Sequence, residues 1–225
     1  FHASNVGSTV DYGGFCMLGT FAERATVSAA SVVKVDDWLP LQSAVLAGCG
    51  VTTGWASAVY DGGVRAGDTV VIYGIGGVGI NAVQGAVHAG AKYVLAVDPV
   101  AFKRETATAF GATHVVATAE EAAVKIAELT WGQMADQALI TVGDLDEDVI
   151  TAATNAVGKG GVVVIVGLGR LDNLDVHVPG SAMALFAKTI KGSLFGGANP
   201  QYDIVRLLRL YDAGRLKLDE LITRR

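Results

Sequence analysis

A glycine-rich turn is the part of the sequence whose residue types and spacing most clearly permit chemistry. Gly74, Gly76 and Gly79 have the spacing G-x-G-x-x-G, directly after the apolar run at 69–73 and before an apolar helical stretch. In this context the first glycine permits a tight turn, the second lets the backbone approach a pyrophosphate, and the third lets helix and strand pack closely. The free N–H groups at the start of the helix would bind the phosphates. The pattern therefore predicts dinucleotide binding.

An acidic residue after the next apolar run extends this pattern. Asp98 follows residues 93–97, about 20 residues after the glycines, where a carboxylate binds the ribose hydroxyls. Its charge repels a 2′-phosphate, so the sequence favours NAD over NADP. Lys103 could bridge to the same ribose, although its spacing also fits an ordinary lysine on a helix surface. The alternative for the whole pattern is a glycine-rich turn and a solvated aspartate, and the order of strand, turn, helix, strand and carboxylate argues against it.

The elements that must position these residues alternate along the chain. Short β-branched runs predict strands at 69–73, 93–97, 114–116, 137–141 and 161–166. Helices are expected at 77–89, 100–110, 119–129 and 147–157. Gly90, Gly111 and Gly158 follow three of these helices, where a left-handed cap is favoured. Apolar strands that alternate with helices predict an α/β fold with a doubly wound parallel sheet.

The chain on either side of this alternation has a different pattern. Residues 19–27 and 31–35 predict short antiparallel strands, and residues 41–60 predict a helical segment that is interrupted at Gly48-Cys-Gly50. Helical spacing returns at 202–213. We therefore expect a dinucleotide-binding domain at 51–194, flanked by parts of a second, β-rich domain at 1–50 and 195–225.

Composition and charge argue against several classes of function. Hydrophobic residues make up 51% of the chain and charged residues 17%, which predicts a packed core rather than disorder. The net charge is −5 and lysines and arginines do not cluster, so no nucleic-acid partner is expected. Apolar runs are too short for a membrane span, and the first residues do not form a secretory signal. Two cysteines, Cys16 and Cys49, cannot make a disulfide framework and suit a cytoplasmic protein.

Other catalytic patterns are weak. A zinc site needs three or four protein ligands, and the sequence has neither a C-x-x-C nor an H-x-x-x-H pair. From its context alone, Cys49 fits a small buried hydrophobe better than a metal ligand. The four histidines are scattered, and no Ser-His-Asp or paired-carboxylate arrangement stands out.

Five motifs together resemble those of a known family. They are Gly-Cys-Gly-Val-Thr-Thr-Gly-Trp at 48–55, Gly-Ile-Gly-Gly-Val-Gly at 74–79, Val-Asp-Pro at 97–99, Phe-Gly-Ala-Thr-His at 110–114 and Thr-Ile-Lys-Gly-Ser-Leu-Phe-Gly-Gly at 189–197. In combination they resemble zinc-dependent alcohol dehydrogenases of the medium-chain dehydrogenase/reductase family. The similarity is greatest to the bacterial nicotinoprotein-like branch, whose members hold their nicotinamide cofactor tightly. It implies a Rossmann domain with partial flanking segments of a GroES-like catalytic domain.

The resemblance also implies cofactors and residue roles. It makes Cys49 the third protein ligand of a catalytic zinc ion in the full-length protein, and it places Thr53 and Val78 against the nicotinamide ring of NAD. Further cofactor contacts are implied at Gly77, Val142, Gly143, Val166, Gly167, Leu168 and Phe195. Such enzymes interconvert alcohols and aldehydes or ketones by hydride transfer while zinc polarises the substrate oxygen. A homo-oligomer, a dimer in particular, is expected through the edge strand at 185–194.

The sequence departs from the family pattern in its zinc ligands. The family's first ligand cysteine, its ligand histidine, its proton-relay hydroxyl residue and its four-cysteine lobe have no counterpart in the sequence. Because one ligand cannot hold catalytic zinc, we expect a fragment that binds NAD without oxidising alcohols on its own. Two alternatives stay open. One is a shortened, non-catalytic NAD-binding module that acts through protein contacts, and the other is a zinc-free quinone-reductase-like enzyme, against which Cys49 argues.

Overall fold

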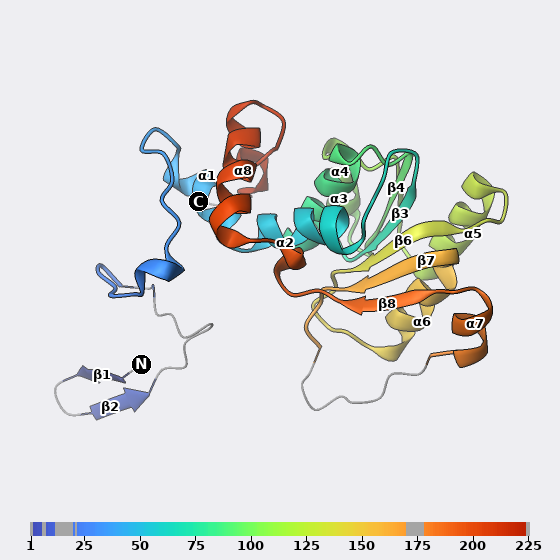
Figure 1. Cartoon of the computed structure of the whole chain (residues 1–225), viewed down its shortest axis with the longest axis horizontal. Helices are drawn as coiled ribbons and strands as arrows, with labels where there is room; N and C mark the ends of the chain where they lie inside the picture. The colour runs from blue at the N-terminus through green and yellow to red at the C-terminus, as the bar shows by residue number, and fades with distance from the viewer. Residues whose placement is uncertain (1, 6–7, 12–19, 21, 170–177, 224–225) are drawn as a thin grey trace. The chain divides into compact units, whose positions relative to one another are not determined.

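The computed structural model describes residues 2–5, 8–11, 20, 22–169 and 178–223 (Figure 1). Contacts within the chain divide it into two units, residues 1–36 and residues 37–225. In the first unit, His2–Asn5 (β1) and Ser8–Asp11 (β2) pair as antiparallel strands. Each unit is considered by itself.

The strands predicted at 19–27 and 31–35 are wrong for the residues that the structure describes there. Residues 20 and 22–36 contain one short helical turn, Ala29–Ser31 (η2), and no strand. Most of their side chains are exposed. An alternating apolar pattern makes a stable strand only when neighbouring strands pair with it and a core covers one face. Among the described residues of the first unit, no strand pairs with this stretch and no core covers one of its faces.

A six-stranded sheet forms the centre of the second unit. Its strand order is β5-β4-β3-β6-β7-β8, and all neighbouring strands run parallel. The strands are Thr69–Tyr73 (β3), Tyr93–Val97 (β4), His114–Val116 (β5), Ala135–Ile140 (β6), Val157–Ile165 (β7) and Thr189–Gly192 (β8). The order reverses between β3 and β6, because β4 and β5 lie on one side of β3 and the later strands on the other. This is the doubly wound α/β sheet that the sequence predicts.

Helices cover both faces of the sheet. They are Gly77–His88 (α3), Ala101–Ala109 (α4), Ala119–Thr130 (α5) and Glu147–Ala156 (α6). Alternate residues of each strand point to opposite faces, so Val70 and Ile72 share one buried core with α3 and α4. Val71 and Tyr73 belong to a second core with α5 and α6. Burial on both faces explains why these strands are almost continuously apolar.

The predicted boundaries are accurate for β3, β4 and β5 and shift at the two following strands. β6 begins at 135 rather than 137, and β7 begins at 157 rather than 161. The chain passes from α6 into β7 at Val157, which has an extended backbone. The predicted helix cap at Gly158 is therefore wrong, because this glycine lies inside the strand. Gly90 and Gly111 have the left-handed conformation predicted for them.

The remaining elements precede and follow the sheet in sequence. They are Leu41–Ala44 (α1), Val45–Gly48 (η3), Gly50–Ala56 (α2), the π-helical Ser57–Asp61 (η4), Gly180–Leu185 (α7), Phe195–Gly197 (η5), Pro200–Asp212 (α8) and Asp219–Leu221 (η6). The predicted helical segment at 41–60 is confirmed, with its interruption at Cys49. The division by contacts falls at residues 36 and 37, and it places α8 in the same unit as the sheet. The predicted domain limits at 50 and 194 stay a prediction. Within the described ranges, no helix has the length and apolar character needed to cross a membrane.

Candidate dinucleotide-binding site

The predicted cofactor residues follow the carboxyl ends of the parallel strands. Gly74 comes directly after β3, Asp98 directly after β4 and Val166 directly after β7. Val142 comes two residues after β6, and Phe195 three residues after β8. Carboxyl ends of parallel strands meet at one edge of a sheet. Because β3 and β6 also flank the reversal of strand order, this edge is where open α/β sheets bind ligands.

The glycines of the turn fall into two pairs. Gly74 has a φ of +86°, and a methyl group there would lie 2.9 Å from a Val142 side-chain carbon. A methyl group at Gly79 would collide with the Gly74 carbonyl oxygen. Gly76 and Gly77 differ, because no atom lies within 4 Å of the position that their Cβ would take. The protein itself therefore requires the first pair, and the second pair borders space that phosphates can occupy.

The N-terminus of α3 leaves backbone donors available at this space. No side chain caps the helix at Gly76, and its first turn contains no acidic residue. The N-termini of α5 and α6 are instead capped by the side chains of Thr118 and Asp146. Unpaired N–H groups and the positive end of the helix dipole both attract anions. The start of α3 thus fits a pyrophosphate group.

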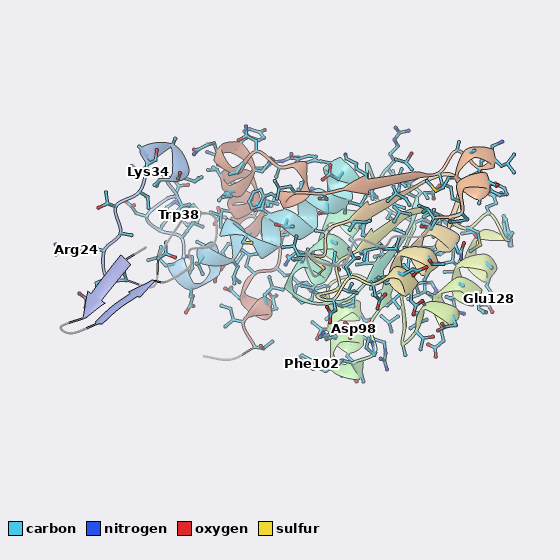
Figure 2. All side chains as sticks on the ribbon, turned by 90° about the horizontal axis from the view of Figure 1, so that it is seen from below. Arg24, Lys34, Trp38, Asp98, Phe102 and Glu128 are labelled. Atoms are coloured by element: carbon cyan, nitrogen blue, oxygen red, sulfur yellow. The ribbon has the colours of Figure 1, made fainter. Side chains whose placement is uncertain are left out.

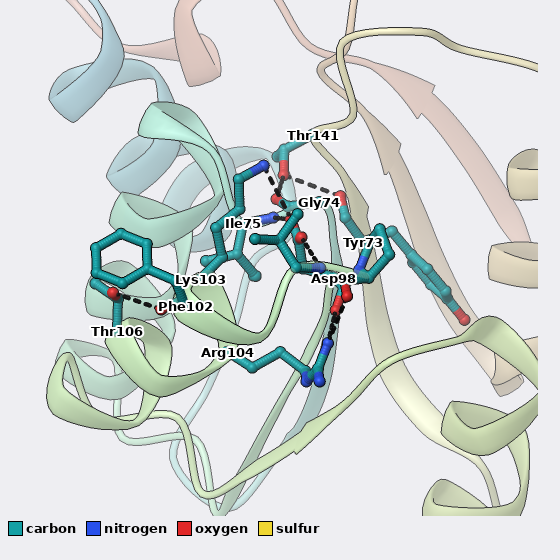
Figure 3. Close-up of polar contacts among 11 residues, drawn as sticks. Tyr73, Gly74, Ile75, Asp98, Phe102, Lys103, Arg104, Thr106 and Thr141 are labelled. Carbon is teal, nitrogen blue, oxygen red and sulfur yellow. Dashed lines mark hydrogen bonds and ion pairs between the residues drawn. The ribbon is translucent and has the colours of Figure 1, made fainter.

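Asp98 is joined directly to the glycine turn (Figure 3). Its side chain is only 3% exposed. The Ile75 N–H donates to Oδ2 at 2.8 Å, and the Val100 N–H donates to Oδ1 at 2.9 Å. Lys103 Nζ lies 3.4 Å from Oδ2. Because each carboxylate oxygen has two lone pairs, Asp98 can hold the turn and still accept a ribose hydroxyl.

Two residues that the sequence interpretation missed complete this network (Figure 3). Thr141 Oγ1 donates to the carbonyl oxygens of Gly74 at 2.6 Å and Tyr73 at 3.0 Å. Arg104 Nη1 donates at 2.8 Å to the carbonyl oxygens of Asp98 and of the residue after it. Both side chains bind backbone atoms, which any residue type supplies. Their spacing therefore carried no signal that sequence inspection could find.

A cavity of about 530 Å³ lies at the turn, a volume in the range of small-molecule sites. Four of the predicted site residues line it: Cys49, Gly76, Gly77 and Lys103. Its wall also includes Phe102 and Thr106 of α4 and the C-terminal residues Glu220, Leu221 and Thr223. The cavity thus connects the predicted metal ligand with the predicted phosphate site. No sequence pattern predicted that Glu220, Leu221 and Thr223 would line it.

The other predicted residues do not line this cavity. Val142 lies against both Gly74 and Gly167, because a methyl group on either glycine would meet it. Thr53 lies beside η5, with its carbonyl oxygen 2.7 Å from the position that a Cβ at Gly196 would take. All the predicted cofactor contacts stay predictions, including those at Val78, Gly143, Val166, Gly167, Leu168 and Phe195. Leu168 is 75% exposed.

Cys49 is exposed rather than buried, so the prediction of a small buried hydrophobe is wrong. Its backbone, with φ −147° and ψ −85°, separates η3 from α2, and the residue lines the cavity. Among the residues that the structure describes, no group of three or more His, Cys, Asp and Glu side chains could hold a metal ion. These residues therefore do not fit catalytic zinc by themselves. Cys16 lies outside the described residues.

Comparison with known proteins decides the family. The family model described as "Zinc-binding dehydrogenase" matches residues 77–213, more than half of the chain. The chain belongs to this family. The match begins at the first residue of α3 and extends past α8, so it covers the parallel sheet from β4 onward. The resemblance inferred from the five motifs is confirmed at the family level.

Similar proteins bear alcohol dehydrogenase names. An NDMA-dependent alcohol dehydrogenase of Amycolatopsis methanolica is 72% identical over 215 residues, which are 96% of this chain and 58% of that protein. Alcohol dehydrogenase B of Mycobacterium tuberculosis is 48% identical over 207 residues, 92% of this chain and 55% of that protein. The crystal structure of an alcohol dehydrogenase zinc-binding domain protein from Burkholderia ambifaria matches with a TM-score of 0.78 at 32% identity, covering 84% of this chain and 50% of that one. The chain thus spans little more than half the length of these relatives.

Proposed function

We propose that this chain binds NAD at the glycine turn and Asp98, as part of an alcohol dehydrogenase that acts on small alcohols or aldehydes. The observation that carries the proposal is the link between Asp98 and the turn through the Ile75 N–H. It joins the candidate ribose ligand to the candidate phosphate site in one buried network. The names of the relatives support the reaction class.

Each part of the proposed site has a separate task. The N–H groups at the start of α3 bind the pyrophosphate, and Gly76 and Gly77 keep the space clear for it. Asp98 accepts a ribose hydroxyl, while its charge excludes a 2′-phosphate. Lys103, which already lies 3.4 Å from Asp98, donates to the same ribose. Bound NAD supplies a hydride acceptor or donor at its nicotinamide ring.

The zinc part of the proposal rests on the family and on Cys49. Cys49 is exposed and lines the candidate cofactor cavity, so a metal ion could reach it. The described residues add no further ligands around it. We therefore derive no zinc-dependent step for this chain, and Cys49 as a zinc ligand stays a prediction.

Titration of NAD and NADP into the chain tests the proposal. NAD should bind at least tenfold more tightly than NADP. Asp98→Ser should weaken NAD binding about tenfold to hundredfold, since hydrogen bonds to charged groups contribute about 1.5–3 kcal/mol each. The ratio of the NAD and NADP affinities shows which effect of Asp98→Ser dominates. Damage to the glycine turn would weaken the binding of both cofactors, whereas loss of the Asp98 charge would only reduce the difference between their affinities.

Glu128→Gln is the matched control. It removes an equal charge from α5, well away from Asp98 (Figure 2), and should leave both affinities within twofold of the parent chain. A parent chain that binds neither cofactor, or an Asp98→Ser variant with an unchanged NAD preference, would contradict the assignment.

A non-catalytic NAD-binding module is the second candidate. The lack of a metal-binding group among the described residues favours it for these 225 residues taken alone. The intact mass of the protein isolated from its native source separates the candidates. A mass near the 23.1 kDa of this chain supports the module, and a much heavier protein excludes it.

A further inference from the structure

Helices α2 and α3 touch backbone to backbone at two points. A methyl group at Gly54 of α2 would collide with the Val78 carbonyl oxygen of α3 and would lie 2.9 Å from the Ala82 nitrogen. Further along, a methyl group at Gly85 of α3 would lie 2.5 Å from the Trp55 carbonyl oxygen. Each helix thus contributes one glycine that lets the other approach.

The two points differ in what lies next to them. Val78 is the second residue of α3 and follows Gly76 and Gly77, which line the cavity. Gly54 lies on the short helix that begins directly after Cys49. The contact at Gly54 therefore sets the distance between two parts of the cavity lining, Gly76 and Gly77 at the predicted phosphate site and Cys49. The contact at Gly85 lies near the far end of α3.

The far side of α2 is also closed. Gly196, in the left-handed conformation, packs so tightly that a methyl group there would lie 2.6 Å from both the Ala56 side chain and the Ser57 nitrogen. The Arg206 guanidinium lies 5.3 Å from the centre of the Trp55 ring. Helix α2 therefore has little room to retreat, and added volume at residue 54 must displace the first turn of α3.

We propose that Gly54 is a positioning residue for the dinucleotide. By lacking a side chain it holds Val78 and the first turn of α3 at a fixed distance from Cys49 and Thr53. This fixes where the nicotinamide half of the cofactor lies. The inference rests on the proposed NAD site and adds to it a residue that does not line the cavity.

Gly54→Ala and Gly85→Ala in the full chain form a matched pair for the test. Both add one methyl group to the same helix interface, and both should lower the melting temperature. Gly54→Ala should weaken NAD binding at least tenfold, while adenosine, which has no phosphate and would occupy the Asp98 part of the site, binds within twofold of the parent chain. NAD should also protect Cys49 less well from alkylation, as followed by peptide mass spectrometry. Gly85→Ala should keep both affinities and the protection.

Several results would overturn the inference. They are unchanged NAD binding by Gly54→Ala, an equal loss of NAD and adenosine binding in that variant, or an equal loss of NAD binding in Gly85→Ala. If Gly54→Ala does not fold, hydrogen exchange of the parent chain decides. NAD should then slow exchange at 51–56 together with 77–82, and slowing confined to 77–82 overturns the inference. If the parent chain binds no NAD, the proposed function fails instead.

Discussion

Two histidines away from the cavity make the stability of the fold depend on pH. Burial lowers the pKa of His114, and the positive charge of Lys125 lowers it further. Burial likewise lowers the pKa of His88, followed by the charges of Arg215 and Arg206. Both imidazoles are therefore harder to protonate in the folded protein than in the unfolded chain, where the pKa is about 6.5.

The unfolded chain consequently binds more protons than the folded protein as the pH falls through about 6.5. The free energy of unfolding should rise with pH between about 5.5 and 7.5, with no further contribution from these groups above that range. Thermal melts across this interval check the expectation. Replacing both histidines with glutamine should flatten the slope, and an unchanged slope in that variant would show that other groups cause it.

Among the elements, the segment that follows α8 is joined to α3 by a pair of hydrogen bonds from one side chain. Gln84 of α3 is 8% exposed. Its Nε2 donates to the Lys217 carbonyl oxygen at 3.0 Å, and its Oε1 accepts from the Lys217 N–H at 2.8 Å. This pair anchors the chain shortly before Glu220 and Leu221, which form part of the cavity wall.

Gln84→Ala should destabilise the protein by about 1–3 kcal/mol, because it leaves the backbone groups of Lys217 without their partner. Urea unfolding measures the loss. Hydrogen exchange should also become faster at 216–223. Gln42→Ala, on an exposed position of α1, is the control and should remain within about 0.5 kcal/mol of the parent. Equal stability of the two variants would show that the hydrogen bonds to Lys217 contribute little.

The elements also show how far sequence alone could go. β3, β4 and β5 were predicted with their correct limits. Burial on both faces gives β3 and β4 apolar runs with clear ends, whereas the half-buried β5 was found from its two β-branched valines. Gly158 misled the prediction, since glycine is frequent both in helix caps and in strands that approach other backbone closely. The strands expected before residue 36 required partners that a local pattern cannot reveal. The limits of local pattern also apply to the site. Asp98 could be predicted from its characteristic spacing after the glycine turn, whereas Thr141 has no such spacing and was missed.

At the scale of the whole molecule, β8 is one of the two edge strands of the sheet, and β5 is the other. In the described part of the chain β8 pairs with β7 only. Leu185 and Leu194, on either side of this strand, are 76% and 90% exposed. An unpaired strand flanked by exposed apolar side chains can pair with a second copy. A twofold axis beside the strand would let β8 of each copy pair with its equivalent and would cover both leucines.

Sedimentation velocity should therefore give twice the 23.1 kDa mass of one chain. The double variant Leu185→Lys and Leu194→Lys should shift the protein to the monomer, because two like charges per copy would meet at the axis. Its melting temperature at low concentration should stay unchanged, since neither leucine is buried within one chain. Val124→Lys places the same charge on an exposed apolar position of α5 and should leave the dimer intact. A parent chain that sediments as a monomer, or a dimer that survives both lysines, would place the contact somewhere other than β8.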